Sequence, residues 1–450
     1  MTSVEASLDG HFTPYVRCFD SLTRSVAEAA KLYLRGLYQS SRANMERMAG
    51  VVEGSHYPRL QHMVSESSWD REGVRRQLVA DANSCFGRGG TALVIDESGF
   101  AKKGTHSAGV ARQWNGRMGK TDNCQVGVFA AITRAQISAL VDGELYLPKA
   151  WTNDPKRCEA AGIPEAAQTF RTKGEIAFEM VLRARRSGLQ FDWVTFDAGY
   201  GHLPWLLQDL EDEGERFLAE VHSDQAIYPA DPKPALPAPG TCGRAPTRLV
   251  SELKPVTASE WAATQDAKAW RTMKLRDGEK GEVVAEFMTA RVFAWDGKAP
   301  KARCWHLLVR REFDGSKLKF CLSNARPSAS LRHLVDTQAF RHFVERAFED
   351  AKGACAMADY QVRGWKAWHH HMTLVMIALM FLAKQRVEGA HTHRLLSCQD
   401  IVEILKHKLP SKTQSDEDLV MNIANRHHRR RQAAKSAYGK HGKMPTASFG

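Results

Sequence analysis

The chain has 450 residues, of which 43% are hydrophobic and 25% charged, and its 63 Lys and Arg against 51 Asp and Glu give a formal net charge of +12. This is the composition of a globular protein of roughly three domains, and it excludes disordered, collagen-like and low-complexity proteins. A basic surplus of this size favours a polyanionic partner, with nucleic acid ahead of an anionic membrane.

Cysteine usage and hydropathy indicate the compartment. The nine cysteines are scattered and no two are spaced as CxxC, which argues against a disulfide framework or a thiolate zinc site. The N-terminus is acidic and lacks the apolar segment of a signal peptide. The apolar stretch 372–383 is too short to span a bilayer and predicts a buried helix. We therefore expect a soluble, cytoplasmic protein with no membrane partner.

The first half of the chain changes from helical to strand patterns. Residues 1–88 predict a small helical domain with basic faces, either a DNA-binding domain or a helical cap. From residue 89 onward the predicted elements are strands at 91–95, 123–133 and 136–147, a helix at 174–188, a strand at 193–196, a helix at 203–213 and a strand at 216–221. Three antiparallel strands followed by this alternation are typical of a ribonuclease H-like fold. We therefore expect an α/β (α+β) catalytic core, with residues 89–228 as its first part.

Prolines mark the next boundary. Seven of the 17 prolines fall between residues 229 and 255, a stretch that can be neither a helix nor a central strand. The following pattern predicts a β-rich insertion over 229–325, with strands near 268–275, 283–294, 303–311 and 317–322. Helices at 337–353 and 364–385 complete the core over 326–390. Residues 391–450 predict a basic tail, whose segment 426–443 has no acid and is expected to be a mobile arm.

Two aspartates follow buried strands. Asp96 closes the predicted strand 91–95 and Asp197 closes the strand 193–196. Carboxylates at such positions project into a shared crevice of an α/β sheet. Because neighbouring carboxylates repel each other, the pair indicates a divalent cation, Mg²⁺ or Mn²⁺, held by oxygen ligands. The alternative is that each aspartate only caps the turn after its strand.

A third carboxylate lies on the helix 337–353. At about 100° per residue, Arg341, Glu345 and Lys352 fall within roughly a 40° arc of this helix. A carboxylate flanked by two cations suits a metal-assisted reaction of a phosphodiester. Glu349 lies close to the same arc and is an alternative third carboxylate. A solvent-facing helix with i,i+4 ion pairs explains the pattern equally well.

These motifs together resemble a known family. IDESGF (95–100), the glycine-rich and basic segment 102–129, TFDAGYG (195–201) and VERAFEDAKG (344–353) resemble bacterial insertion-sequence transposases of the DDE superfamily, in the group of insertion-sequence family 701. The wider class carries the signature Y-x2-R-x3-E-x6-K. Arg341, Glu345 and Lys352 match this spacing, which favours Glu345 over Glu349, while Gln338 stands at the tyrosine position.

The resemblance implies a function and its residues. Asp96, Asp197 and Glu345 would bind two Mg²⁺ ions, for which Mn²⁺ can substitute, while Arg341 and Lys352 would hold phosphate oxygens. The expected protein is a transposase that cleaves the ends of its element and joins the 3′-OH to target DNA. Its expected partners are double-stranded DNA, both terminal inverted repeats and target, and a second copy of the chain on the paired ends. The alternatives are a catalytically inactive DNA-binding protein and a metal-dependent nuclease without strand transfer.

The basic loop, the tryptophans and the histidines each have a functional and a structural interpretation. The basic loop after Asp96 predicts contacts with a DNA backbone, although an ordinary polar hairpin also explains it; its cations include Lys102, Lys103 and Arg112. Related transposases stack an insertion tryptophan on a displaced base. Core packing is the simpler role for the four tryptophans present here, Trp261, Trp270, Trp295 and Trp305. The histidines at 369–371, 391 and 393 are expected to be solvated or at the edge of the core, and not to bind metal.

Overall fold

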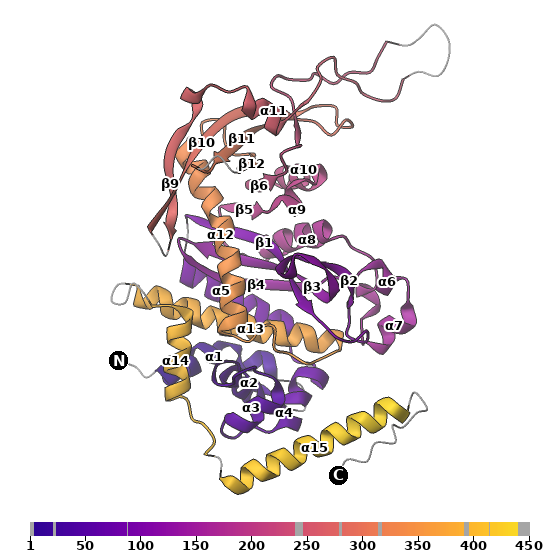
Figure 1. Cartoon of the computed structure of the whole chain (residues 1–450), viewed down its shortest axis with the longest axis vertical. Helices are drawn as coiled ribbons and strands as arrows, with labels where there is room; N and C mark the ends of the chain where they lie inside the picture. The colour runs from indigo at the N-terminus through magenta and orange to yellow at the C-terminus, as the bar shows by residue number, and fades with distance from the viewer. Residues whose placement is uncertain are drawn as a thin grey trace.

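The computed structural model describes residues 4–20, 24–87, 89–238, 246–278, 281–313, 317–390, 396–413 and 415–439. The molecule is elongated, with the N-terminal helices at one end, a mixed β-sheet in the middle and a set of long strands at the other end (Figure 1). One long helix, α12 (Leu331–Gly353), runs along this axis and contacts both ends of the sheet. The structure is therefore mixed α/β, as predicted, and its long strands form one large mixed sheet.

The N-terminal region is helical, as predicted. Its main helices are α1 (Val4–Phe12), α2 (Ala27–Gln39), α3 (Met45–Val51), α4 (Tyr57–Gln61) and α5 (Arg71–Phe86). They pack around α13 (Trp365–Gly389), which comes from the far end of the chain. The Tyr38 hydroxyl donates to the carbonyl of Ala378 at 2.8 Å, and the Tyr33 hydroxyl lies 2.8 Å from Nδ1 of His371. These buried polar contacts fix the helical region onto the rest of the molecule.

Helix α13 is largely buried. Eighteen of its side chains are buried, which explains its long apolar stretch. The expectation that His369, His370 and His371 are solvated or at the edge of the core was wrong, because all three are buried, with 3%, 4% and 0% exposed. Each of them uses a ring nitrogen on a backbone carbonyl, and His370 also stacks on Trp69. His391 and His393 lie outside the described residues. None of the helices that the structure describes has the length and apolar character needed to cross a bilayer.

The centre of the sheet contains the strands predicted first. They are β1 (Thr91–Ala101), β2 (Ala111–Asn115), β3 (Lys120–Arg134), β4 (Ile137–Leu145), β5 (Trp193–Phe196) and β6 (Phe217–Val221). β3 pairs antiparallel with β1, β2 and β4, while β5 pairs parallel with β1 and β6. Helices α8 (Lys173–Arg186), α9 (Ala198–Gly201) and α10 (Pro204–Asp212) connect the parallel strands. The spatial order in this part is therefore β4-β3-β1-β5-β6.

The predicted β-rich segment extends the same sheet. Its long strands are β9 (Arg271–Gly278), β10 (Gly281–Ala294), β11 (Arg303–Arg311) and β12 (Leu318–Ser323). β12 pairs antiparallel with β6, so the sheet continues in the order β6-β12-β11-β10-β9. The proline-rich segment lies between two short strands, β7 (Ala226–Ile227) and β8 (Val256–Thr257). Its described part has no helix or further strand and makes only isolated β-bridges, as its prolines predict. Among the four tryptophans, Trp305 is buried against Phe217, and Trp261 and Trp270 pack against the core.

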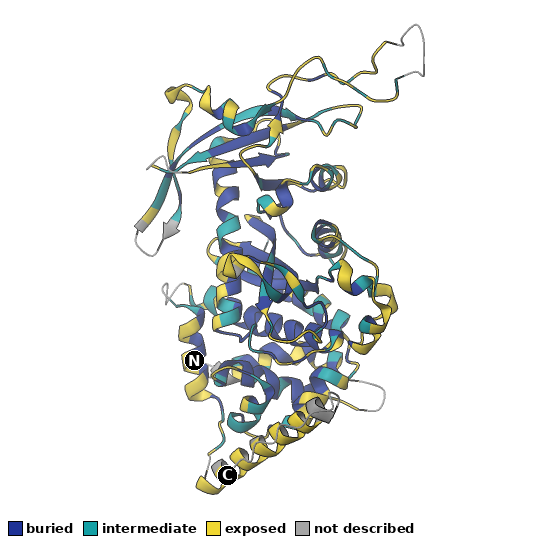
Figure 2. Cartoon of the chain, turned by 45° about the vertical axis from the view of Figure 1, so that its right-hand side comes forward, coloured by how far each residue is buried: buried dark blue, intermediate teal, exposed yellow. Residues whose placement is uncertain are grey.

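The region predicted as a basic tail contains two helices. α14 (Cys398–Lys408) buries Ile401, Val402 and Leu405 against the N-terminal helices and α13, so this part is packed and is not a free tail. α15 (Asp416–Gly439) covers most of the segment predicted as a mobile arm, and every described side chain on it is exposed (Figure 2). Residues 440–450 lie outside the described residues.

Candidate active site

The sheet register places the two aspartates side by side. Ile95 of β1 is in register with Phe196 of β5, so the next residues, Asp96 and Asp197, leave the parallel pair together. Asp197 ends β5 because its carboxylate accepts the backbone N–H of Gly199 and caps α9. Asp96 differs from its prediction, since β1 does not end there. The strand continues to Ala101 because its other edge stays paired with β3.

Helix α12 brings the third carboxylate. Its N-terminus is capped by Ser330, and its buried face packs on β1, β3, β4 and β5. Arg341 points from this helix toward the aspartates. Its Nη2 lies 3.2 Å from Oδ2 of Asp96 and 3.9 Å from Oδ2 of Asp197, and its Nη1 lies 3.4 Å from Oε1 of Glu345. One guanidinium therefore joins all three carboxylates that the sequence singled out.

Burial makes this cluster electrostatically unusual. Asp96 has 12% of its side chain exposed, against 32% for Asp197 and 60% for Glu345. Burial raises the pKa of Asp96 to about 7, with Asp197 adding to the shift and Arg341 opposing it. For Arg341, burial works against the charged form, but the carboxylates of Asp96 and Asp197 outweigh it and the pKa is raised. The guanidinium thus acts as the counter-ion of the aspartate pair.

The residues present fit a divalent cation in their chemistry. Asp96 and Asp197 offer carboxylate oxygens to the same nitrogen of Arg341, and hard cations such as Mg²⁺ prefer oxygen ligands. Within the described residues no group of three or more His, Cys, Asp or Glu side chains is close enough to form a complete metal site. The aspartate pair fits as a partial ligand set, which Glu345 completes only if its exposed side chain moves inward.

Glu349 and Lys352, the other residues of α12 that the sequence singled out, have different surroundings in the structure. Glu349, the alternative carboxylate, is one turn beyond Glu345, is 70% exposed and pairs with Arg346 at 3.5 Å. Lys352 lies further along the helix, with its ammonium 5.9 Å from the ring centre of Phe100 and 5.5 Å from that of Phe348. The structure therefore brings Glu345 to Arg341, and it leaves Lys352 beside aromatic rings near the end of β1.

The predicted basic loop is split between two surfaces. The Lys102 ammonium sits 3.5 Å from the ring centre of Tyr360, and burial lowers its pKa to about 8. Lys102 and Lys103 line a cavity of about 410 Å³ together with residues 360–363. Arg112 is exposed on the edge strand β2, on the same side as Trp114, which is 55% exposed. The three cations therefore do not form a single cluster.

The sequence did not single out the cavity next to Glu345. This cavity, of about 210 Å³, lies between α12 and the strands β6, β9, β11 and β12, and its lining includes Arg310, Lys319, Gln338, Arg341 and Glu345. Arg310 and Lys319 face each other across the β11–β12 register. The side-chain Oε1 of Gln338 is buried there and has no hydrogen-bond partner among the described residues. The basic residues Arg310 and Lys319 on two predicted neighbouring strands were the available sequence signal.

The sequence analysis also did not identify a buried tyrosine near the carboxylates. Tyr200 is 3% exposed, and its hydroxyl has no hydrogen-bond partner within the described part of the chain. Burial raises its pKa far above the usual range, and the charges of Glu97, Asp96 and Asp197 add to this effect. The phenol thus stays protonated beside the carboxylates. Its position in TFDAGYG, three residues after Asp197, was the sequence signal.

Comparisons with known proteins agree with the resemblance that the motifs indicated. The model of the DDE superfamily endonuclease family matches residues 17–282, which contain both Asp96 and Asp197 but not Glu345. A probable transposase for insertion sequence element IS701, from Microchaete diplosiphon, is 28% identical over 195 residues. That match covers 42% of this chain and 47% of the relative, so the chain matches about half of the relative's length.

A solved structure gives a more distant comparison. The piggyBac transposase in a synaptic complex with hairpin DNA matches 94% of this chain and 85% of its own, with 10% identity and a TM-score of 0.41. The family match, by contrast, covers more than half of the chain. The prediction from the motifs is therefore confirmed at the level of the family: this chain belongs to the DDE superfamily endonucleases.

Proposed function

We propose that this protein is a DNA transposase, which cleaves phosphodiester bonds at the ends of an insertion sequence and joins the freed 3′-OH to target DNA. The observation that carries the proposal is the meeting of Asp96, Asp197 and Glu345 around Arg341. Membership of the DDE endonuclease family supports the cleavage step. The basic net charge supports DNA as the substrate.

The sheet topology supports a ribonuclease H-like core. The antiparallel strands β1, β3 and β4, followed along the chain by the parallel strands β5 and β6, match the succession of elements predicted from the sequence, and their spatial order is β4-β3-β1-β5-β6. In this arrangement the carboxyl ends of the parallel strands meet at one edge, where α/β proteins bind their ligands. Asp96 and Asp197 lie at that edge.

The metal-binding residues of this proposal are Asp96, Asp197 and Glu345, with Mg²⁺ as the cofactor and Mn²⁺ as a substitute. When bound, such cations supply activation of the attacking water and neutralisation of charge at the leaving oxygen. The role of Asp96 and Asp197 is to offer ionised oxygens at fixed positions. Glu345 closes the site by moving inward from its exposed position on α12.

Arg341 and Lys352 are proposed to hold phosphate oxygens of the substrate. Arg341 is a fork of donors that pairs with phosphate as well as with carboxylate. A bound phosphate would compete with the aspartates for the donors of Arg341 and so weaken their ion pairs. In this way Arg341 would change from the counter-ion of the aspartates to the counter-ion of the substrate phosphate.

A cleavage and joining assay tests the proposal. The substrate is a labelled duplex that carries the element's terminal repeats, with Mg²⁺, and the proteins are wild type, Asp197→Asn, Glu345→Gln and Glu349→Gln. We expect wild type and Glu349→Gln to cut at the repeat boundary and to produce joined strands, while the other two variants lose at least about 3 kcal/mol of transition-state stabilisation, or more than 100-fold in rate.

The other outcomes separate the alternatives. Binding without cutting by all four proteins would leave a catalytically inactive DNA-binding protein. Cutting without joined product would leave a nuclease. If Glu349→Gln loses activity and Glu345→Gln keeps it, the third metal-binding carboxylate is Glu349 and not Glu345. Because two ends must be cut and joined together, the proposal also includes a homodimer on paired ends, which the stoichiometry of the DNA complex tests.

A further inference from the structure

Three cavities meet at the loop between α12 and α13. The largest, about 760 Å³, lies between the N-terminal helices and α15. A second, of about 270 Å³, adjoins α3 and α4, and the third is the 410 Å³ cavity beside Lys102 and Lys103. Gln361 lines all three cavities, and Arg363 lines the second and third. They therefore follow one another from α15 to the end of β1.

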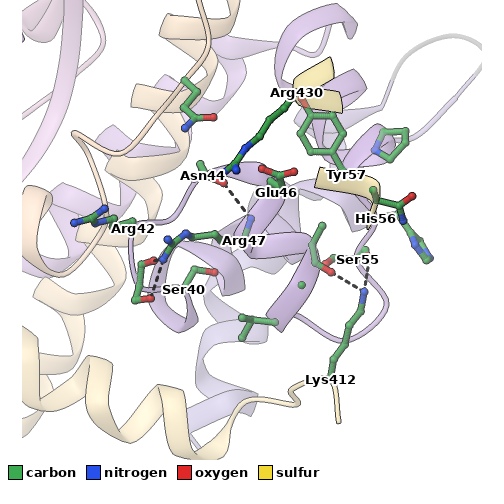
Figure 3. A pocket seen from close by; sticks show the side chains of 17 residues that line it. Ser40, Arg42, Asn44, Glu46, Arg47, Ser55, His56, Tyr57, Lys412 and Arg430 are labelled. Carbon is green, nitrogen blue, oxygen red and sulfur yellow. Dashed lines mark hydrogen bonds between the residues drawn. The ribbon is translucent and has the colours of Figure 1, made fainter. Parts of the chain in front are cut away.

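The lining of this succession is strongly basic. In the largest cavity the basic side chains are Arg42, Arg47, His56, Lys412 and Arg430, and Glu46 is the one acid among the described lining residues. Arg363, Lys102, Lys103 and His106 continue the basic lining to the other end. Arg430 points from α15 toward Asn44 on the opposite wall (Figure 3). The positive charge thus comes from both walls.

Two of these cations are held by backbone carbonyls. The Lys412 ammonium donates to the carbonyl oxygens of Ala49 at 2.7 Å and Ser55 at 2.8 Å (Figure 3). Arg47 donates through Nη1 to the carbonyl oxygen of Ser41 at 2.9 Å. Carbonyls fix the position of a cation without cancelling its charge. The wall of the cavity therefore presents positioned positive charge.

The same wall has unused hydrogen-bonding capacity. Ser40 is 8% exposed and lines the largest cavity, and its hydroxyl has no hydrogen-bond partner among the residues that the structure describes. A buried hydroxyl without a partner is costly, and a ligand with acceptor oxygens removes the cost. This points to an anion with oxygen atoms at the surface.

Helix α15 presents many exposed side chains. All of its described side chains are exposed, including Val420 at 65% and Met421 at 63%. These exposed side chains are accessible to a partner from outside the chain. Its described basic residues, Arg430, Arg431 and Lys435, suit a polyanion as that partner.

We propose that the three cavities form one groove that holds a phosphodiester backbone of double-stranded DNA, with α15 closing over it. The proposal rests on the function proposed above, in that DNA is the polyanion. Lys102 directly follows β1 and lies six residues after Asp96, about 20 Å along an extended chain. The groove therefore binds the duplex away from the point of cleavage and directs it toward the carboxylates.

Salt-dependent binding tests the groove without any need for catalysis. A fluorescein-labelled duplex is titrated, without metal, with wild type and with Lys103→Gln, Arg363→Gln and Arg430→Gln, singly and combined, over a series of KCl concentrations. Each lost phosphate contact should lower the slope of log Kd against log[KCl] by about 0.9, and the triple variant by nearly three times that amount. A matched triple variant, Arg186→Gln, Lys298→Gln, Lys301→Gln, removes the same charge from exposed positions outside the groove and should keep the wild-type slope.

The outcomes are distinct. Equal slopes in wild type and the groove variant, with unchanged melting temperatures, would overturn the groove while leaving DNA binding intact. Absence of binding by wild type would overturn the proposed function as well. If inorganic phosphate raises the melting temperature of wild type but the groove substitutions leave DNA affinity unchanged, the cavity is a phosphate site and the proposal fails. Slower amide hydrogen exchange in α15 on addition of duplex would support closure of the helix.

Discussion

At the scale of single residues, Arg341 organises the candidate site. The sequence pattern predicts that Arg341 contacts phosphate. In the structure its guanidinium forms ion pairs with Asp96, Asp197 and Glu345. The reason is electrostatic: two neighbouring carboxylates at a buried strand end repel each other unless a positive group lies between them. Without substrate or cation, the nearest guanidinium takes that position.

The variant Arg341→Gln should make stability depend on a divalent cation. Removing one partner of a largely buried ion pair costs about 3–5 kcal/mol, so the metal-free variant should melt well below wild type. Mn²⁺ should then raise its melting temperature more than that of wild type, because the carboxylates no longer have an internal counter-ion. Thermal unfolding at pH 7 with and without Mn²⁺ measures both effects.

The control for this prediction is Arg332→Gln. Arg332 lies on the same helix, but its ion pair with Asp336 is exposed, so its loss should change stability by less than about 1 kcal/mol and leave the response to Mn²⁺ unchanged. An equal Mn²⁺ response in wild type and Arg341→Gln would show that the guanidinium does not compete with the cation.

At the scale of elements, the turn after β5 sets the position of Asp197. Helix α9 lies against β6 so closely that a Cβ on Gly201 would be 1.9 Å from the carbonyl oxygen of Glu220. That oxygen belongs to the backbone of a central strand, which cannot move aside. Glycine is therefore required at this position for close packing.

We expect Gly201→Ala to destabilise the fold by at least about 2–3 kcal/mol, the usual cost of overpacking. Gly10→Ala is the matched control, since a Cβ on Gly10 meets no atom within 4 Å and alanine in a helix gains about 0.5–1 kcal/mol over glycine. Urea unfolding of both variants measures the difference. A Gly201→Ala protein as stable as wild type would mean that α9 and β6 separate easily.

At the scale of the whole molecule, α13 joins the N-terminal helices to the sheet through buried histidines. Burial lowers the pKa of His370 to about 3 and that of His371 to about 4, below the usual 6.5. Below pH 6.5 the unfolded chain binds protons that the folded chain does not. This contribution to stability is therefore complete above pH 6.5 and is lost as the pH falls, at up to about 1.4 kcal/mol per pH unit for each histidine.

His370→Asn should remove one of these contributions. The variant should be less stable than wild type at pH 7.5, because it loses the ring stacking on Trp69. Between pH 6.5 and 5, however, its free energy of unfolding should fall less steeply than that of wild type. Urea unfolding across this range measures the slope, and His407→Asn, at an exposed position on α14, should keep the wild-type slope. Parallel curves for wild type and His370→Asn would contradict the buried, neutral state of His370.

Much of the architecture was predictable because local pattern decides it. Strand and helix periodicity predicted β1, β5, β6 and α13, and the prolines predicted that the described part of the segment after β7 has no helix or long strand. The pairing of β12 with β6, which extends one sheet to the far end of the molecule, was not predictable. Pairing across about 100 residues depends on long-range packing that leaves no local signature.

The sequence by itself determined the family and singled out the candidate carboxylates, since their order and spacing are local features. Only the tertiary structure decided that Arg341 is the counter-ion of Asp96 and Asp197, that Glu345 and not Glu349 reaches it, and that the adjacent histidines of α13 are buried. It also decided that basic residues from distant parts of the chain line one succession of cavities. The physical reason is the same in each case: charge pairing and burial depend on which segments meet in space, and that is fixed by packing of the whole chain.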